Sequence, residues 1–152
     1  MNKDIGFIIV NTENSYFNII SKLFDKLQTF NKLNQYAVFC STLKLRTNRI
    51  GIPFLPLVEA QFFQGSLLVF DIQSFLYVKN FPNINKIYYY MDKISWDGLQ
   101  MNPYRDLKNI FDTPNLEIIA SDDIIYYLCY NCWKKPLCIA KDLDYDSIKN
   151  FL

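Results

Sequence analysis

Short apolar runs alternate with amphipathic segments along almost the whole chain, and this alternation constrains the fold more than any other feature. The run Ile5–Val10 contains no polar side chain, which is typical of a strand buried on both faces. The segment Asn14–Phe30 then repeats apolar residues every three or four positions, which predicts an amphipathic helix. A second apolar run, Tyr36–Cys40, follows. Strand, helix and strand in this order predict a parallel pair, because parallel strands need a crossover connection.

The same alternation continues to the end of the chain. Further strands are predicted at Ile50–Phe54, Leu67–Phe70, Ile87–Met91, Leu116–Ala120 and Leu137–Ala140. Helices are predicted at Leu57–Phe63, Ile72–Val78, Tyr104–Phe111 and Ile124–Trp133, with a terminal helix that starts at Asp144 or Asp146 and runs to Leu152, and Pro53 and Pro56 are predicted to bracket a turn. We therefore predict one α/β domain over residues 1–152, with a doubly wound, mainly parallel sheet and helices on both faces, as in Rossmann-like folds.

The composition excludes several classes of function. With 51% hydrophobic and only 20% charged residues, the 152-residue chain can build a core and is not disordered. Sixteen Lys and Arg against 15 Asp and Glu give a net charge of +1, so nucleic-acid binding is not indicated. The chain has no histidine, which excludes Ser-His-Asp and Cys-His catalysis and histidine-ligated metals.

No segment reaches the ~18 consecutive apolar residues that a membrane-spanning helix needs. The first residues, Met1–Asp4, run directly into a predicted strand without the apolar stretch of a signal peptide. We therefore expect a cytoplasmic protein, in the host cytoplasm if a phage encodes it, with its four cysteines reduced.

The spacing Cys129-x-x-Cys132, with Cys138 nearby, is compatible with a metal or redox site. One face of the predicted helix carries five residues with apolar or thiol side chains: Ile124, Ile125, Leu128, Cys129 and Cys132. Buried free cysteine packs as a small apolar side chain, so core packing is favoured and neither a metal nor a cofactor is expected.

Ligands of doubly wound sheets bind outside the carboxyl ends of the strands, near the point where the strand order reverses. The residues that follow the predicted strands form the candidate surface: Asn11, Thr12, Cys40, Ser41, Asp71, Asp92, Lys93, Ser121, Asp122, Lys141 and Asp142. Among them we predict Asn11, Thr12, Asp71 and Ser121 to bind ligand. Asp92 is the candidate catalytic residue, because a long loop rather than a helix follows it. Helix capping is an alternative role for Asp71 and Asp122.

Two loops supply further candidates. Trp96 follows a strand end, where it could line a sugar or base pocket or pack as a lid on the core. Arg46 and Arg49 belong to a basic loop that could bind phosphate or simply face solvent. The run Tyr88–Tyr90 could stack on bases, but side chains alternate along a strand, which favours core packing. Four scattered glycines form no glycine-rich phosphate loop.

Two passages resemble the N-terminal domain of two-domain glycosyltransferases of the GT-B type. One is Ile87–Asp92 followed by Trp96, and the other is Asn115–Ser121, a helix, and then Lys135–Ala140. In addition, Ile52–Leu57 followed by Gly65–Val69 is similar to small glycosyltransferase-like proteins of tailed phages.

The resemblance implies a domain that binds a nucleotide-sugar or a sugar acceptor at the strand ends. It also implies that the chain is half of a transferase, an acceptor-side or accessory domain, or a divergent form that completes its site by pairing with a second transferase domain or in a homo-oligomer. The alternative is a non-enzymatic accessory or assembly protein that acts through an aromatic-rich interface, since 17% of its residues are aromatic.

Overall fold

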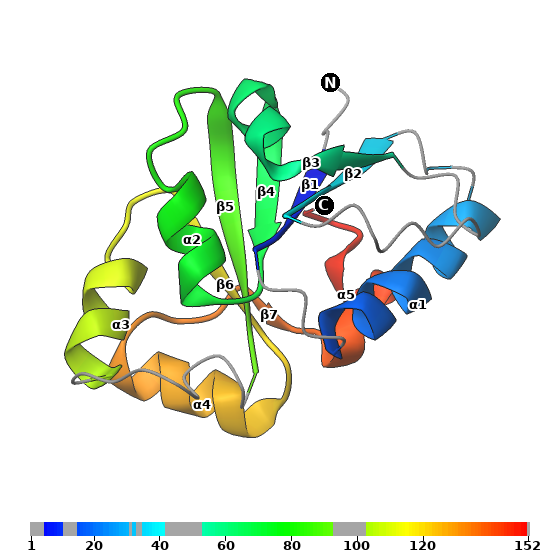
Figure 1. The fold of residues 1–152 in the computed structure, drawn as a ribbon. Coiled ribbons are helices and arrows are strands. Elements are labelled where there is room, and N and C mark those ends of the chain that lie inside the picture. Colours follow the sequence, from blue (N-terminus) through cyan, green and yellow to red (C-terminus); the bar gives the residue numbers. More distant parts are fainter. Residues whose placement is uncertain are drawn as a thin grey trace.

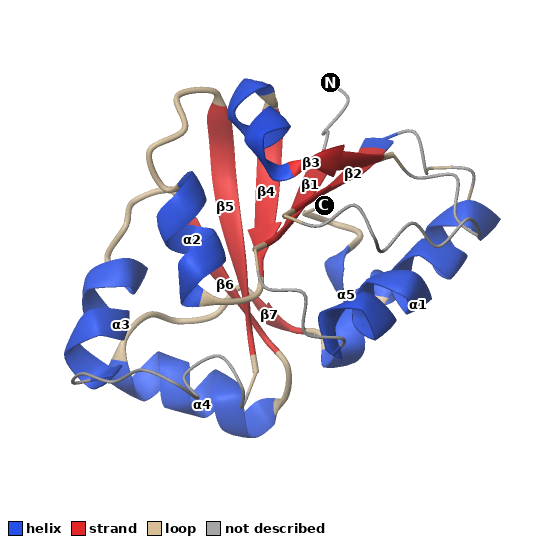
Figure 2. Ribbon diagram, in the orientation of Figure 1, coloured by secondary structure: helices blue, strands red, loops and turns tan. Residues whose placement is uncertain are grey.

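A seven-stranded, entirely parallel sheet forms the centre of the molecule (Figures 1 and 2). The computed structural model describes residues 5–10, 15–30, 32, 35–41, 53–92 and 103–151. The strands are β1 (Ile5–Ile9), β2 (Tyr36–Cys40), β3 (Phe54–Pro56), β4 (Gly65–Val69), β5 (Ile84–Met91), β6 (Leu116–Ala120) and β7 (Cys138–Ile139). Their order in the sheet is β3-β2-β1-β4-β5-β6-β7. The chain therefore starts in the middle of the sheet and builds outward, first to one side and then to the other.

Helices cover both faces of this sheet (Figure 2). They are α1 (Ser15–Thr29), the 3-10 helix η3 (Leu57–Phe62), α2 (Ile72–Val78), α3 (Pro103–Phe111), α4 (Asp123–Cys132), the 3-10 turn η4 (Lys141–Leu143) and α5 (Tyr145–Ile148). The helices α1 and α5 pack on one face, and η3, α2, α3 and α4 pack on the other. This arrangement confirms the predicted α/β class with a parallel sheet.

The two faces have separate cores, and the alternation of side chains along each strand assigns residues to one or the other. Tyr88 and Tyr90 lie in the core beneath α1 and α5, whereas Tyr89 lies in the core beneath the other helices. All three rings are buried. The prediction that this tyrosine run serves core packing is therefore confirmed, and it offers no stacking platform at the surface.

The prediction for Pro53 and Pro56 is wrong in part. They do not bracket a turn, because Pro56 is the last residue of β3, where it pairs with Cys40 of β2. Strand β3 is at the edge of the sheet, and no further strand lies on its outer side. Proline is tolerated there because its missing N–H would have had no neighbouring strand to bond to. Of the predicted strand Ile50–Phe54, residues 50–52 lie outside the described residues, and the strand that the structure describes is Phe54–Pro56.

The predicted apolar face of the helix α4 is also wrong at one residue, Ile124. Ile125 and Cys129 are four residues apart and face the sheet, and Ile124, about 100° around the helix from Ile125, is 71% exposed. The terminal helix is shorter than predicted, since α5 ends at Ile148.

Candidate functional site

The order of the strands reverses between β1 and β4, where the chain turns to build the second half of the sheet. At this point Asp71 accepts two hydrogen bonds from Ser74, from its backbone N–H at 2.7 Å and from its hydroxyl at 3.0 Å. The Ser74 hydroxyl in turn accepts a bond from the N–H of Val10, the residue after β1, at 3.4 Å. Ser74 is fully buried. Asp71 therefore caps α2, as the sequence predicted, and also ties the ends of β1 and β4 together.

The double role of Asp71 gives a testable contrast with Asp122, which caps α4 by accepting a bond from the N–H of Ile125 at 2.9 Å. We expect Asp71→Ala to lower the free energy of unfolding by about 2 to 3 kcal/mol, because it also leaves the buried Ser74 hydroxyl without its acceptor. Asp122→Ala should cost about 1 kcal/mol. Urea denaturation of both variants measures the difference, and equal losses would contradict the linking role of Asp71.

Three strand ends bring predicted site residues close together. Strands β4, β5 and β6 are neighbours, and Met91 pairs with Ala120. The N–H of Ser121 donates to the carbonyl of Met91 at 3.0 Å, which fixes Ser121 beside the residue that precedes Asp92. The Ser121 hydroxyl donates to Asp122 at 3.2 Å. The structure thus brings Asp92 and Ser121 together on adjacent strand ends, next to Asp71 on the third.

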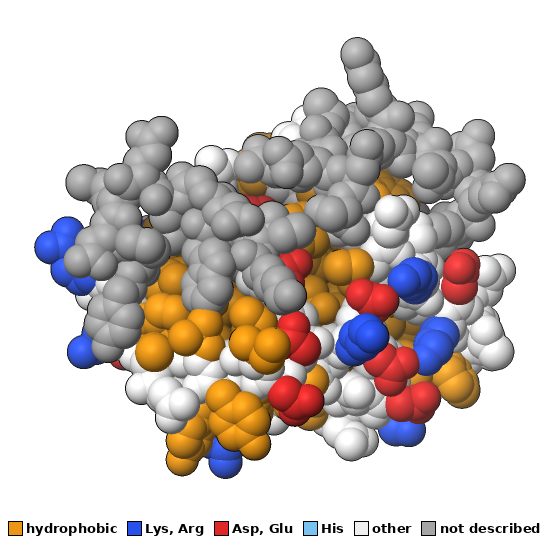
Figure 3. All heavy atoms as spheres, turned by 90° about the horizontal axis from the view of Figure 1, so that it is seen from below, with side chains coloured by type: hydrophobic (Ala, Val, Ile, Leu, Met, Phe, Trp, Pro, Cys, Tyr) orange, Lys and Arg blue, Asp and Glu red, His pale blue; other side chains and the backbone are white. Residues whose placement is uncertain are grey.

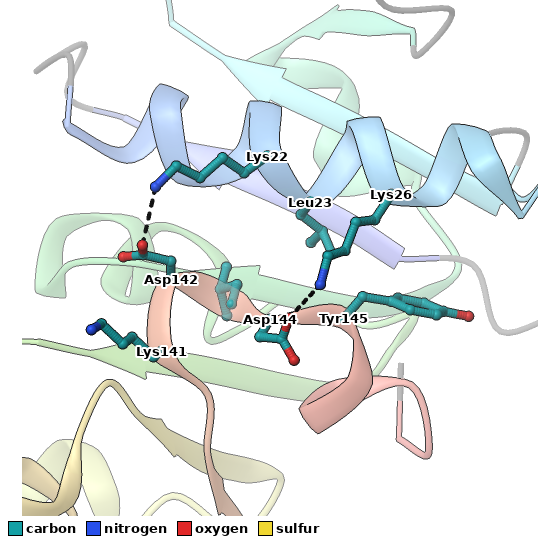
Figure 4. Close-up of a pocket in the computed structure, with 8 residues that line it drawn as sticks. Lys22, Leu23, Lys26, Lys141, Asp142, Asp144 and Tyr145 are labelled. Atoms are coloured by element: carbon teal, nitrogen blue, oxygen red, sulfur yellow. Dashed lines mark hydrogen bonds and ion pairs between the residues drawn. The ribbon is translucent and has the colours of Figure 1, made fainter.

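A pocket of about 420 Å³ lies between α1 and the segment that follows β7 (Figure 4). Its lining consists of Lys22, Leu23, Lys26, Lys141, Asp142, Leu143, Asp144 and Tyr145. Two ion pairs cross it, from Lys22 to Asp142 at 3.1 Å and from Lys26 to Asp144 at 2.5 Å. The hydrogen bond between Lys26 and Asp144 raises the pKa of the lysine and lowers the pKa of the aspartate. Both pairs are partly exposed to solvent, so an incoming charged ligand has access to them.

Tyr90 connects this pocket with the strand ends. Its hydroxyl interacts with the backbone of Asp142 and Leu143, and burial, followed by the negative charges of Asp92 and Asp142, raises its pKa to about 12. Asp142 and Leu143 both have positive φ angles, 51° and 52°, so the backbone turns sharply where it meets this hydroxyl. Asp92 and the segment that follows β7 therefore both lie near Tyr90, on the same side of the sheet.

The far wall of the pocket is held by Tyr145. Its ring stacks on Phe30 with centroids 4.9 Å apart, and its hydroxyl accepts a bond from Lys32 at 3.1 Å. The carboxyl edge as a whole shows Lys and Asp side chains gathered over α1 and the segment after β7, with further acidic side chains toward the middle (Figure 3). The pocket thus places cations beside the acidic side chains that the structure describes at this edge.

The surroundings of Cys129 and Cys138 favour the protonated thiol. Cys129 is buried with its Sγ 3.3 Å from Sδ of Met91, and burial raises its pKa to about 12. Burial also raises the pKa of Cys138, to about 11. Protonated thiols are poor nucleophiles and poor metal ligands. The prediction that Cys129 packs in the core is confirmed.

Several predicted site residues lie outside the described residues: Asn11, Thr12, Arg46, Arg49, Lys93 and Trp96. Conversely, the sequence analysis did not single out Lys22 and Lys26. Their only signal is the spacing of four residues, which places two lysines on one face of the predicted helix. Nothing local to α1 indicates that acids more than 100 residues later lie opposite them.

The fold and the pocket define a parallel α/β domain with a charged site beside the carboxyl ends of its strands. Comparison with protein-family models, curated proteins and solved structures finds no match to this chain. The resemblance to glycosyltransferases therefore stays a prediction. Within the described residues, no helix is both long and apolar enough to cross a bilayer.

Proposed function

We propose that this chain binds a phosphorylated sugar, of which a nucleotide-sugar is the leading example, in the pocket between α1 and the segment after β7. The observation that carries the proposal is the position of a pocket lined by lysines and aspartates beside the carboxyl edge of a parallel sheet. Parallel sheets with this strand order bind ligands at that edge. The volume of about 420 Å³ lies within the range of small-molecule sites, ~300–1,000 Å³.

The charged groups of the pocket match the two chemical parts of such a ligand. Lys22, Lys26 and Lys141 carry three positive charges against the two negative charges of Asp142 and Asp144, which leaves a net charge of +1 (3 − 2). Each ammonium has three donors, so lysine can bind phosphate oxygens as a point charge. Carboxylates accept hydrogen bonds from sugar hydroxyls.

Asp92 is our candidate for acid–base work on the bound sugar. Asp92 follows β5, and its negative charge contributes to the raised pKa of Tyr90. The Tyr90 hydroxyl also interacts with the backbone of Asp142, which lines the pocket. Because the chain contains no histidine, a carboxylate is the natural choice for a proton acceptor. A second domain or a second chain would supply the rest of a transferase site.

Isothermal titration calorimetry with UDP-glucose, UDP, glucose 1-phosphate and glucose tests the proposal. We expect the phosphorylated ligands to bind and glucose alone to bind more weakly. The double variant Lys22→Gln/Lys26→Gln should weaken UDP-glucose binding about tenfold or more, because two charge-assisted bonds to phosphate are lost. Asp112 is exposed, and α3 lies between it and the carboxyl edge. Asp112→Asn therefore serves as the control for Asp92→Asn, because it removes the same charge at a position away from the proposed site.

A second pair of substitutions separates phosphate binding from loss of the ion pairs. Asp142→Asn/Asp144→Asn breaks the same two pairs as the lysine variant but leaves both ammonium groups, so it should tighten the binding of UDP about threefold or more. Lys108→Gln, on the exposed side of α3, should change nothing. The proposal fails if no phosphorylated ligand binds at millimolar concentration, or if both double variants shift affinity in the same direction.

A further inference from the structure

The turn that follows β7 has a backbone conformation that most residues avoid. Asp142 and Leu143 have φ angles of 51° and 52°, in the left-handed region that favours glycine. Two such residues in succession carry a conformational cost, which contacts with the rest of the structure must offset. The N–H of Leu143 donates to the carbonyl of Ala140 at 3.1 Å, but turns with negative φ angles make the same bond, so it does not set these angles.

Tyr90 of β5 meets this turn from the core. Its hydroxyl is hydrogen-bonded to the backbone of Asp142 and of Leu143, and the residue is only 2% exposed. Leu143 is fully buried in the same core. The ring of Phe70 packs edge-on against Tyr90, with centroids 6.0 Å apart, which holds the hydroxyl in place. A buried polar group that loses its partner is costly, so the Tyr90 hydroxyl favours the turn over conformations that break this contact.

The same turn sets the position of a charged group of the pocket. Asp142 pairs with Lys22 across the pocket at 3.1 Å (Figure 4). The Asp142 side chain is 50% exposed, so its direction depends on the backbone that carries it. A rotation of φ at Asp142 from 51° to an ordinary negative value would swing its Cβ, and the carboxylate would leave its place opposite Lys22. The position of this carboxylate is therefore coupled to the buried Tyr90 hydroxyl.

We propose that Tyr90 is a positioning residue of the pocket, whose hydroxyl holds the turn at Asp142 and Leu143 and so aims the Asp142 carboxylate at the sugar hydroxyls of the ligand. This inference rests on the proposed function, in which the carboxylates bind the sugar and the lysines bind phosphate. Tyr90 is buried, so it acts through Asp142 and does not contact the ligand. Tyr90 therefore governs recognition of the sugar and not of the phosphate.

Tyr88 supplies a matched control on the same strand. It lies in the same core as Tyr90 and is 4% exposed, and its hydroxyl donates to the backbone carbonyl of Phe151 at 3.0 Å. Tyr88→Phe thus removes a comparable buried hydroxyl whose backbone partner does not line the pocket. Both Tyr90→Phe and Tyr88→Phe should lower stability, but only Tyr90→Phe should affect the turn.

Nuclear magnetic resonance of the ligand-free protein tests the contact between Tyr90 and the turn. In Tyr90→Phe, we expect the backbone chemical shifts and the one-bond Cα–Hα couplings of Asp142 and Leu143 to move toward the values of negative φ angles. In Tyr88→Phe they should stay at the wild-type values. The measurement needs no ligand and is thus independent of the proposed function. Unchanged signals of both residues in Tyr90→Phe overturn the inference.

Calorimetry with UDP-glucose and the methyl ester of UDP tests the effect on binding. The two ligands carry the same charge, so the ratio of the Kd of the methyl ester to the Kd of UDP-glucose reports what the sugar hydroxyls contribute. Tyr90→Phe should lower this ratio about fivefold or more and leave the methyl ester bound at least as tightly as by the wild type. Asp142→Asn, which replaces the carboxylate with a neutral amide, should lower the ratio similarly, and Tyr88→Phe should not change it.

The double variant Tyr90→Phe/Asp142→Asn separates positioning from a general structural role. If Tyr90 acts through Asp142, the double variant has about the same ratio as Asp142→Asn alone, whereas independent effects would multiply. With ligands that bind, an unchanged ratio in Tyr90→Phe, an equal fall in Tyr88→Phe or multiplied effects overturns the inference and leaves the proposed function standing. If neither ligand binds at millimolar concentration, the proposed function fails, and the role of Tyr90 in sugar recognition fails with it.

Discussion

Replacing Gly6 with valine is expected to destabilise the fold by about 4 kcal/mol or more, and replacing it with alanine by about 2 kcal/mol. Gly6 lies in the central strand β1, between Ala37 of β2 and Leu67 of β4. A Cβ at this position would lie 2.7 Å from Cδ2 of Leu67 and 2.8 Å from Cε2 of Phe39. Both side chains are buried in the same core and have little room to move. The glycine therefore allows Phe39 and Leu67 to pack across the strand.

Urea denaturation followed by circular dichroism measures these losses, and a double-mutant cycle identifies their cause. Phe39→Leu removes ring atoms that the new Cβ would meet. The combined variant Gly6→Ala/Phe39→Leu should be more stable than the sum of the two single effects predicts, by about 1 kcal/mol. A Gly6→Ala protein as stable as the wild type would show that this core accommodates the methyl group without strain.

Alkaline conditions are expected to destabilise the protein steeply between pH 9 and pH 11. Burial raises the pKa of Tyr36 and of Tyr90 to about 12, from an ordinary value of 10.0, and also raises the pKa of Tyr88. A raised pKa in the folded state means that the folded state holds its proton more tightly. The stabilisation from each tyrosine is complete below pH 10 and is lost as the pH rises toward 12.

The thiols of the buried Cys129 and the half-buried Cys138 act in the same direction, starting at lower pH. The pKa of Cys129 is raised from 9.0 to about 12 and that of Cys138 to about 11. Together with the tyrosines, they should lower the free energy of unfolding by about 4 kcal/mol or more between pH 9 and pH 11. Guanidinium denaturation at a series of pH values measures this loss.

Single tyrosine variants separate the contributions to this alkaline loss. Tyr36→Phe removes one buried hydroxyl and should reduce the loss by about 1 kcal/mol. Tyr127→Phe, at an exposed position, should leave the loss unchanged. A free energy of unfolding that stays constant from pH 9 to pH 11 would mean that the buried tyrosines and thiols ionise without cost in the folded protein.

Much of the fold could be predicted from the sequence, because its main signals are local. The strand Tyr36–Cys40 and the helix Ile72–Val78 occur at the predicted residues. The caps at Asp71 and Asp122 also form as predicted, since an N-cap depends on backbone groups only two or three residues away. The failures occur where distant neighbours decide: Pro56 enters a strand because β2 lies beside it, and Ile124 is exposed because it faces away from the sheet on which Ile125 and Cys129 pack.

The candidate site was predictable only in part. Asp92 and Ser121 were expected at strand ends, and the pairing of β5 with β6 brings them side by side. The pocket itself was not predicted, because it is formed by residues that are far apart in the sequence. Lys22 and Asp142 are separated by 120 residues, and Lys26 and Asp144 by 118. No short-range pattern reports that such side chains meet.

The sequence by itself determined that the chain forms a parallel α/β layer structure and that polar residues collect at one edge of its sheet. Apolar runs and helical spacing encode these properties within a few residues, so tertiary contacts are not needed to read them. Only the tertiary structure decided the strand order, the lysine–aspartate pocket and the contact of Tyr90 with the segment after β7. These depend on which distant segments pack against each other, and that choice is made by the whole set of buried side chains together.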